Sequence, residues 1–170
     1  LITDAAINIA PSLEDKMHIV QNAIELAIMM GVPEPKVAIL SAVETVNVKI
    51  RSTLDAAALC KMADRGQIRG GLLDGPLAFD NAVSLVAAKT KGIRSAVAGQ
   101  ADILVVPDLE SGNMVAKQLE YLADALMAGV VLGTRVPIVL TSRADTAETR
   151  TASCAIAQLM AHKRRQGVRL

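Results

Sequence analysis

Residues 36–42 read KVAILSA, a short and mostly apolar run. It follows the helix-ending residues Gly31 and Pro33 and precedes a polar stretch at 43–52. An apolar run of this length between turn signals is typical of a buried strand. Strands buried on both faces occur in parallel sheets that helices cover on each side. The run therefore predicts an α/β fold.

The segments on either side of this strand alternate between strand and helix patterns. Residues 1–9 predict a strand, and Ser12 and Asp15 then form a capping-box pattern for a helix that ends near Met30. Asp145 and Glu148 form a similar pattern before the last helix. Downstream helices are predicted at 53–65, 80–91, 112–126 and 145–163, with strands at 71–74, 102–106, 129–132 and 138–141. This alternation predicts a mostly parallel sheet with helices on both faces.

Composition limits the classes of function. The 170 residues carry 18 basic and 17 acidic side chains, and the net charge is +1. A nucleic-acid surface would need a clear basic excess. The single Phe, the single Tyr and the absence of Trp also remove the stacking platforms for single strands. A mixed-charge solvated surface fits better.

The cysteines and the hydropathy pattern bear on the compartment. Cys60 and Cys154 have apolar neighbours and no motif spacing, so we expect free core thiols in a reducing compartment. Their spacing to His18 and His162 does not fit a metal site. No apolar run is long enough to span a membrane, and no signal peptide is apparent, so we expect a cytoplasmic protein. Because the chain begins with Leu1, we expect the natural protein to start upstream.

Candidate ligand sites lie where strands end. In open α/β sheets, ligands bind beyond the carboxyl ends of the strands. One candidate site, at 141–145, contains Ser142, Arg143 and Asp145 between a predicted strand and a helix start. Backbone N–H groups and a guanidinium there favour the binding of a phosphate. A capped turn with a solvated arginine fits the same pattern. Polar turn residues follow four predicted strands, at 41–45, 74–76, 107–113 and 141–145.

The other strand ends also have two interpretations. Gly112 and Asn113 could offer backbone donors to a substrate, or could belong to an ordinary turn capped by Ser111. Asp74, Asp80 and Asn81 are candidate substrate-binding residues. Alternatively, Asp80 caps a helix and Asp74 ends a strand.

Glu44 and Asn47 in the long polar loop could bind a ligand or face solvent. No GxxxxGK[ST], GxGxxG or GxSxG motif occurs, which disfavours nucleotide hydrolases and serine hydrolases.

Four strings occur in an order that resembles one family. They are AILSAVE at 38–44, LDGPLAFDNA at 73–82, VPDLESGNM at 106–114 and LTSRAD at 140–145. Together they resemble the phosphate acetyltransferase and phosphate butyryltransferase family across essentially the whole chain. The resemblance is closest to the acyltransferase domain of bacterial bifunctional proteins in which it follows an enoyl-CoA hydratase domain.

The resemblance implies a fold, an activity and partners. The family's fold is similar to that of isocitrate and isopropylmalate dehydrogenases, with two α/β domains around a cleft. Residues 1–140 would be the second domain, and 141–170 would return to a first domain that this sequence lacks. Members form homodimers through the second domain. The reaction moves an acyl group reversibly between coenzyme A and phosphate. Coenzyme A thioester is a substrate, and no metal or other cofactor is needed.

The resemblance also assigns the catalytic pair. Ser142 would bond near the reacting thiol, and Arg143 would hold phosphate or acyl phosphate. Acetyltransferases of the family usually carry an Asp seven residues after this Ser, whereas this sequence has Thr149. This departure favours the butyryltransferase-like branch and leaves the general base unassigned. The alternative is a non-catalytic acyl-CoA-binding or assembly domain, as in multidomain malic enzymes. We expect the isolated fragment to be inactive.

Overall fold

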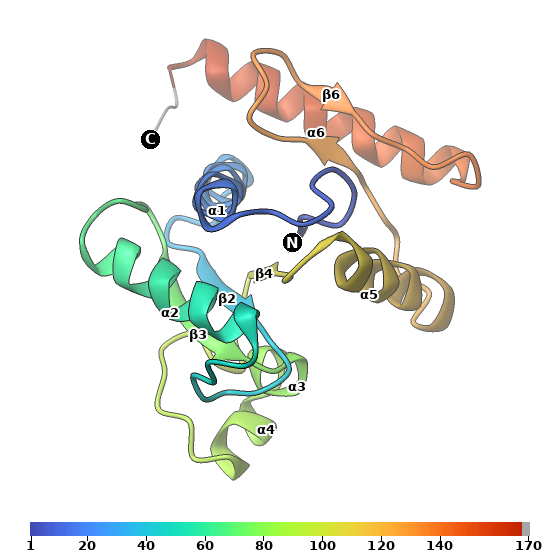
Figure 1. Ribbon diagram of the computed structural model, residues 1–170. Coiled ribbons are helices and arrows are strands. Elements are labelled where there is room, and N and C mark those ends of the chain that lie inside the picture. Colours follow the sequence, from blue (N-terminus) through green and yellow to red (C-terminus); the bar gives the residue numbers. More distant parts are fainter. Residues whose placement is uncertain (168–170) are drawn as a thin grey trace.

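A four-stranded parallel sheet forms the centre of the computed structural model, which describes residues 1–167 (Figure 1). Residues 168–170, the end of the predicted 141–170 segment, lie outside the described residues. The sheet order is β1-β4-β2-β3. The strands are β1 (Ile2–Thr3), β2 (Lys36–Leu40), β3 (Leu72–Leu77) and β4 (Ile103–Val105). The predicted α/β class with a mostly parallel sheet is confirmed.

Helices cover both faces of this sheet (Figure 1). On one face, α1 (Leu13–Met29) and α2 (Arg51–Asp64) pack through Val20, Ile24 and Leu59. On the other face lie α3 (Phe79–Val83) and α4 (Leu85–Thr90), whose Ala82 and Ala88 join Leu40 and Leu104. The helix α5 (Leu109–Leu122) follows β4 and contacts β1 at the edge of the sheet.

The predicted capping box of α1 is present. The Asp15 N–H donates to Ser12 Oγ at 3.2 Å, and the Ser12 N–H donates to Asp15 Oδ2 at 2.9 Å. These two bonds satisfy donors that a helix start leaves without intrahelical partners. They fix the point at which the chain leaves the β1 loop and enters α1.

The prediction of one continuous helix at 80–91 is wrong. Ser84 adopts an extended conformation, with φ −123° and ψ 114°, between α3 and α4. Its hydroxyl accepts the N–H of Ala87 and so caps α4. A serine favours such a cap because its side chain competes with the helical backbone for hydrogen bonds. The break redirects the chain so that Lys91 approaches Asp80.

The last two strands form a separate antiparallel hairpin, β5 (Val130–Val131) with β6 (Ile138–Val139). A Cβ on Gly129 would lie only 2.3 Å from the Leu140 carbonyl oxygen, so this close approach requires glycine. The hairpin packs with α6 (Ala147–Arg165) against the outer side of α1, through Leu26, Met29 and Met160. The predicted strands therefore exist but do not join the parallel sheet.

Two further local predictions are wrong, one about the N-cap of α6 and one about the burial of Cys154. The N-cap of α6 is Thr146, whose hydroxyl accepts the Thr149 N–H, and Asp145 is therefore not the cap. Cys60 is partly buried, but Cys154 is exposed on α6, so the expectation of two core thiols is wrong for Cys154. Within residues 1–167, no helix is both long and apolar enough to cross a membrane.

Candidate functional site

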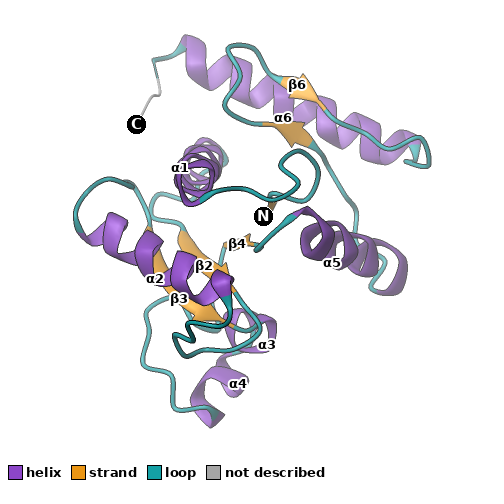
Figure 2. Ribbon diagram, in the orientation of Figure 1, coloured by secondary structure: helices purple, strands orange, loops and turns teal. Residues whose placement is uncertain are grey.

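The loops that follow the parallel strands leave the sheet at one shared edge (Figure 2). After β2 the chain forms the loop at 41–50, after β3 it enters α3, and after β4 it enters α5. Polar side chains that follow different strands can meet here because all the strands point the same way. The residues that gather at this carboxyl edge differ in part from those that the sequence predicted.

A charged cluster joins the ends of β2 and β3. Lys91 Nζ lies 2.6 Å from Glu44 Oε1 and 3.0 Å from Asp80 Oδ2. Hydrogen bonds from Lys91 are the main reason that the pKa of Glu44 and the pKa of Asp80 are lowered, and both carboxylates raise the pKa of Lys91. All three groups therefore stay charged near neutral pH, and the cluster carries a net negative charge.

Asn81 lies beneath this cluster and is fully buried. Its Nδ2 donates to Glu44 Oε1, whereas its Oδ1 has no hydrogen-bond partner within residues 1–167. A buried side chain in this position holds Glu44 in place from below. Asp80 and Lys91 are exposed and Glu44 is partly exposed, so these three side chains, unlike Asn81, can meet a ligand directly.

Asp74 does not lie at a strand end. The strand β3 continues to Leu77, and Asp74 is paired within the sheet opposite Ala38. Its carboxylate accepts the neighbouring Gly75 N–H at 2.8 Å. Burial first, and the charge of Asp74 second, raise the pKa of Cys60 to about 12. The structure therefore places Asp74 within the sheet and apart from the charged cluster.

The polar loop after β2 folds back onto the start of α2. Thr53 is fully buried, and its hydroxyl accepts the Asn47 N–H at 2.9 Å. The same hydroxyl lies 2.7 Å from the Ile50 carbonyl oxygen, and Ser41 Oγ lies 2.8 Å from Ser52 Oγ. These bonds tie the long loop to the sheet edge. The backbone of Asn47 is therefore engaged within the protein.

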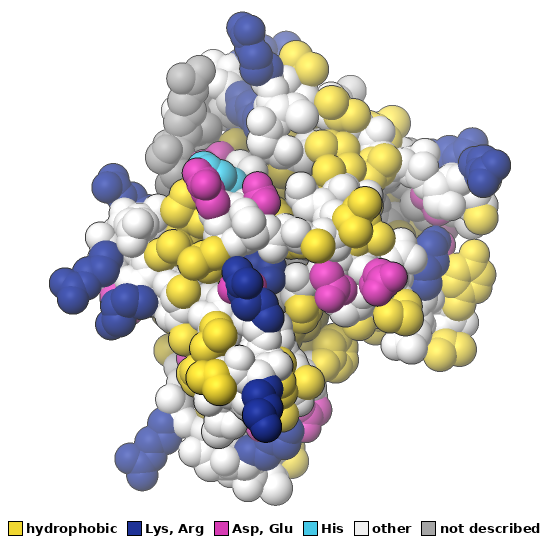
Figure 3. Space-filling model, in the orientation of Figure 1, with side chains coloured by type: hydrophobic (Ala, Val, Ile, Leu, Met, Phe, Trp, Pro, Cys, Tyr) yellow, Lys and Arg dark blue, Asp and Glu magenta, His cyan; other side chains and the backbone are white. Residues whose placement is uncertain are grey.

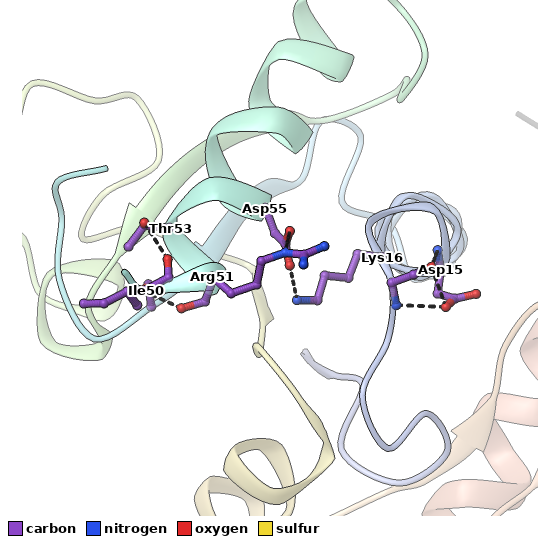
Figure 4. A network of polar contacts seen from close by, with 9 residues as sticks. Asp15, Lys16, Ile50, Arg51, Thr53 and Asp55 are labelled. Atoms are coloured by element: carbon purple, nitrogen blue, oxygen red, sulfur yellow. Dashed lines mark hydrogen bonds and ion pairs between the residues drawn. The ribbon is translucent and has the colours of Figure 1, made fainter. Parts of the chain in front are cut away.

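A buried ion pair crosses from α1 to α2 (Figure 4). Lys16 Nζ lies 2.8 Å from Asp55 Oδ2, and both side chains are less than a tenth exposed. The Arg51 Nε donates to Asp55 Oδ1 at 2.9 Å and lies mostly in solvent. Sequence analysis missed this pair. A signal was present, because Lys16 continues the helical spacing of the buried positions Val20 and Ala23.

The loop after β1 closes around its own carboxylate. Asp4 accepts the N–H groups of Ala6, Ile7 and Asn8 at 2.8–3.0 Å. Burial opposes ionisation, but these hydrogen bonds outweigh it and lower the pKa of Asp4. A run of backbone N–H groups can bind an anion. Here the Asp4 side chain already fills that position.

The start of α5 differs from the prediction. Its N-cap is Asp108, not Ser111, and the Asp108 carboxylate accepts the Ser111 N–H. The Gly112 N–H donates to the Asp108 carbonyl oxygen at 3.1 Å, so it is not a free donor for a substrate. A Cβ on Gly112 would lie 2.7 Å from Val106 Cγ2, which explains the glycine. Asn113 lies beside it and reaches the Ala5 carbonyl oxygen at 3.5 Å.

The predicted catalytic pair lies on an exposed turn between β6 and α6. The Ser142 N–H donates to Asp145 Oδ2 at 2.6 Å, and the Asp145 N–H donates back to the Ser142 carbonyl oxygen at 3.2 Å. Arg143 stands at the tip of the turn, exposed and without an ion pair among residues 1–167. A guanidinium in this position is available to an anion.

The turn and the charged cluster remain separate within the described residues. No hydrogen bond or ion pair of residues 1–167 links the turn at 142–145 to Glu44, Asp80 or Lys91. On α5, hydrogen bonding to Glu120 is the main cause that raises the pKa of Lys117, and the charge of Asp145 contributes to the same shift. Among residues 1–167, no group of three or more His, Cys, Asp or Glu side chains is arranged to hold a metal ion.

Comparison with known proteins identifies similar sequences over nearly the whole chain. Residues 1–158 match the family described as "Phosphate acetyl/butaryl transferase". A phosphate acetyltransferase of Rhizobium meliloti is 68% identical over 164 residues, which cover 96% of this chain and 52% of that relative. A probable phosphate butyryltransferase of Bacillus subtilis is 54% identical over 156 residues, covering 92% and 52%. The chain thus spans about half the length of these curated relatives.

Solved structures agree with these matches. The crystal structure of a branched-chain phosphotransacylase from Enterococcus faecalis V583 superposes with a TM-score of 0.86 and 38% sequence identity. The match covers 95% of this chain and 58% of that one. A phosphotransacetylase from Streptococcus pyogenes gives a TM-score of 0.77 at 32% identity, covering 94% of this chain and 49% of that one.

Proposed function

Because this chain belongs to the phosphate acetyl/butyryl transferase family, we propose that its natural protein transfers an acyl group reversibly between coenzyme A and inorganic phosphate. The match over residues 1–158 is the observation that carries the proposal. Acyl-CoA and phosphate react to give acyl phosphate and free coenzyme A. Coenzyme A thioester is a substrate, and the proposed reaction needs no further cofactor.

In this proposal Arg143 and Ser142 act at the reacting centre. Phosphate is a strongly hydrated and weak nucleophile, so the protein has to hold it against the thioester carbonyl. The exposed Arg143 guanidinium supplies a planar pair of donors for phosphate. Ser142 hydrogen-bonds near the sulfur of coenzyme A. Asp80, Gly112 and Asn113 remain candidates to line the substrate path, whereas buried Asn81 and in-sheet Asp74 would act only through their neighbours.

A first α/β domain is proposed to complete the cleft. The relatives are about twice as long as the part of them that this chain matches, which supports this view. Residues 1–140 would form the second domain, with 141–170 returning to the first. We also propose that the natural protein carries further N-terminal domains. The length of the natural gene product tests this proposal. Two unpaired cysteines fit a reducing compartment, so we place the enzyme in the cytoplasm.

We also propose that the chain forms a homodimer through helices of the region 13–126. Exposed apolar side chains support a partner surface there, and Figure 3 shows such side chains over the region of α5. Burial of apolar area drives association of this kind. The exposed apolar side chains of this region include Phe79, Val83, Val86, Met114, Tyr121 and Leu122.

The experiment that tests the function is an assay of the natural full-length protein. Acetyl-CoA, butyryl-CoA and a branched acyl-CoA are each mixed with phosphate, and both free thiol and acyl phosphate are measured. Stoichiometric release of both products supports the proposal. Tight binding of acyl-CoA without turnover would instead favour the alternative, a non-catalytic acyl-CoA-binding or assembly domain. A preference for butyryl-CoA would support the branch that Thr149 indicates.

Arg143 offers a sharper test of the mechanism. Loss of a charge-assisted contact to phosphate costs several kcal/mol, so Arg143→Ala should lower kcat/KM about a hundredfold or more. Arg143→Lys keeps the charge but loses the planar fork, and an intermediate defect is expected. Arg150, exposed on α6, provides the matched control, and Arg150→Ala should behave like wild type. Near-normal turnover of Arg143→Ala would favour a solvated arginine on a turn.

A further inference from the structure

Asp145 closes a ring of hydrogen bonds around the turn that carries Ser142 and Arg143. Its carboxylate accepts the Ser142 N–H at 2.6 Å, a charge-assisted bond. Its own N–H returns a bond to the Ser142 carbonyl oxygen at 3.2 Å. The two bonds join the first and last residues of the turn. They restrict the backbone angles of the tip residue Arg143, which a longer bond of 3.4 Å from the Ala144 N–H to Ser142 Oγ also spans.

We infer that Asp145 is a positioning residue, which sets the turn so that the backbone of Arg143 is held in one place at the proposed phosphate site. This inference rests on the proposed function. Fixing a turn in advance removes the ordering entropy that a flexible loop would lose when it binds its ligand. A displacement of about 1 Å at a reacting centre can cost about a hundredfold in rate. A constraint next to the proposed phosphate-binding group can therefore have a large effect on the rate.

The environment of Thr149 supports this assignment. The hydroxyl of Thr149 lies 3.2 Å from Thr146 Oγ1, and the residue is 5% exposed. The position seven residues after Ser142 thus faces the start of α6 rather than the outside of the turn. Asp145 is the carboxylate that bonds to Ser142 itself. Its Oδ2 accepts the backbone N–H of Ser142, and a carboxylate that is bonded in this way stabilises the turn.

Two substitutions distinguish the role of the Asp145 charge from the role of its hydrogen-bond acceptor. Asp145→Ala removes both, whereas Asp145→Asn keeps an oxygen that can accept the Ser142 N–H. We expect Asp145→Ala in the natural full-length protein to lower kcat/KM for phosphate about tenfold or more, mainly through KM. Asp145→Asn should recover to within about threefold of wild type, because a neutral acceptor forms a weaker bond in the same place. Glu148→Ala, an exposed carboxylate three residues away, is the matched control and should leave both constants unchanged.

Amide hydrogen exchange supplies a readout that does not depend on catalysis. The Ser142 amide should exchange several-fold faster in Asp145→Ala than in wild type or Asp145→Asn. Equal exchange in all three proteins would overturn the inference, and so would wild-type kinetics in Asp145→Ala. Equal defects in the Ala and Asn variants would assign the carboxylate charge to chemistry or substrate binding instead. A wild-type protein without acyl transfer would refute the proposed function, while the exchange rates would still report on the turn.

Discussion

At the scale of single residues, Lys16–Asp55 is the ion pair of residues 1–167 in which both side chains are buried. Burial opposes ionisation of Asp55, but hydrogen bonds from Lys16 and Arg51 outweigh it and lower its pKa from the usual 3.8. Asp55→Asn leaves the Lys16 charge buried without a carboxylate, so we expect a loss of about 3–5 kcal/mol in the free energy of unfolding. Urea unfolding at pH 7 measures this loss.

The same pair predicts a pH dependence. Because the pKa of Asp55 is lower in the folded state, its contribution is present above the unfolded value of 3.8 and is lost as pH falls through the folded value. The difference between wild type and Asp55→Asn should therefore shrink below about pH 4. Asp64, on the same helix and paired with Lys61 in solvent, is the control, and Asp64→Asn should change little. A difference that stayed constant down to pH 2 would contradict this account.

At the scale of secondary structure, the Ser12 cap is a testable unit. Ser12→Ala removes the acceptor for the Asp15 N–H at the start of α1, and helix caps contribute about 1 kcal/mol. We expect that loss in chemical denaturation, and we expect Ser12→Asn to retain most of the stability. An Ala variant as stable as wild type would show that the bond does not stabilise α1.

Local patterns made these elements predictable from the sequence. The strand predicted at 36–42 and the α1 capping box follow from short-range spacing, and both were confirmed, with the strand ending at Leu40. The break at Ser84 was missed because the spacing of apolar residues passes through it without a Gly or Pro. The strands predicted at 129–132 and 138–141 exist, but their antiparallel pairing was not predicted because such short strands carry no sign of their direction. The Glu44–Lys91 contact joins residues 47 apart in sequence, and no local pattern reports such a pair.

At the scale of the whole molecule, the match to only about half of each relative leads to a prediction about the isolated chain. If the first domain supplies the other wall of the cleft, residues 1–170 alone should fold and form no acyl phosphate above background. They should still sediment as a dimer at micromolar concentration, because the proposed partner surface lies within 13–126. Enzyme-like turnover by the isolated chain, or a monomer in sedimentation, would refute the corresponding proposal.

The loop after β1 has a consequence for anion selectivity. The Asp4 carboxylate blocks the binding of other anions to this loop, because it already accepts the three N–H groups that a free anion would need. A ligand attached to the same chain competes at an effective concentration that dissolved phosphate does not reach. If phosphate is the substrate, as proposed, the occupied loop should not bind it, whereas the exposed Arg143 guanidinium remains open to it. Asp4→Ala would vacate the loop, and phosphate should then acquire a second, weaker binding position that titration calorimetry can count.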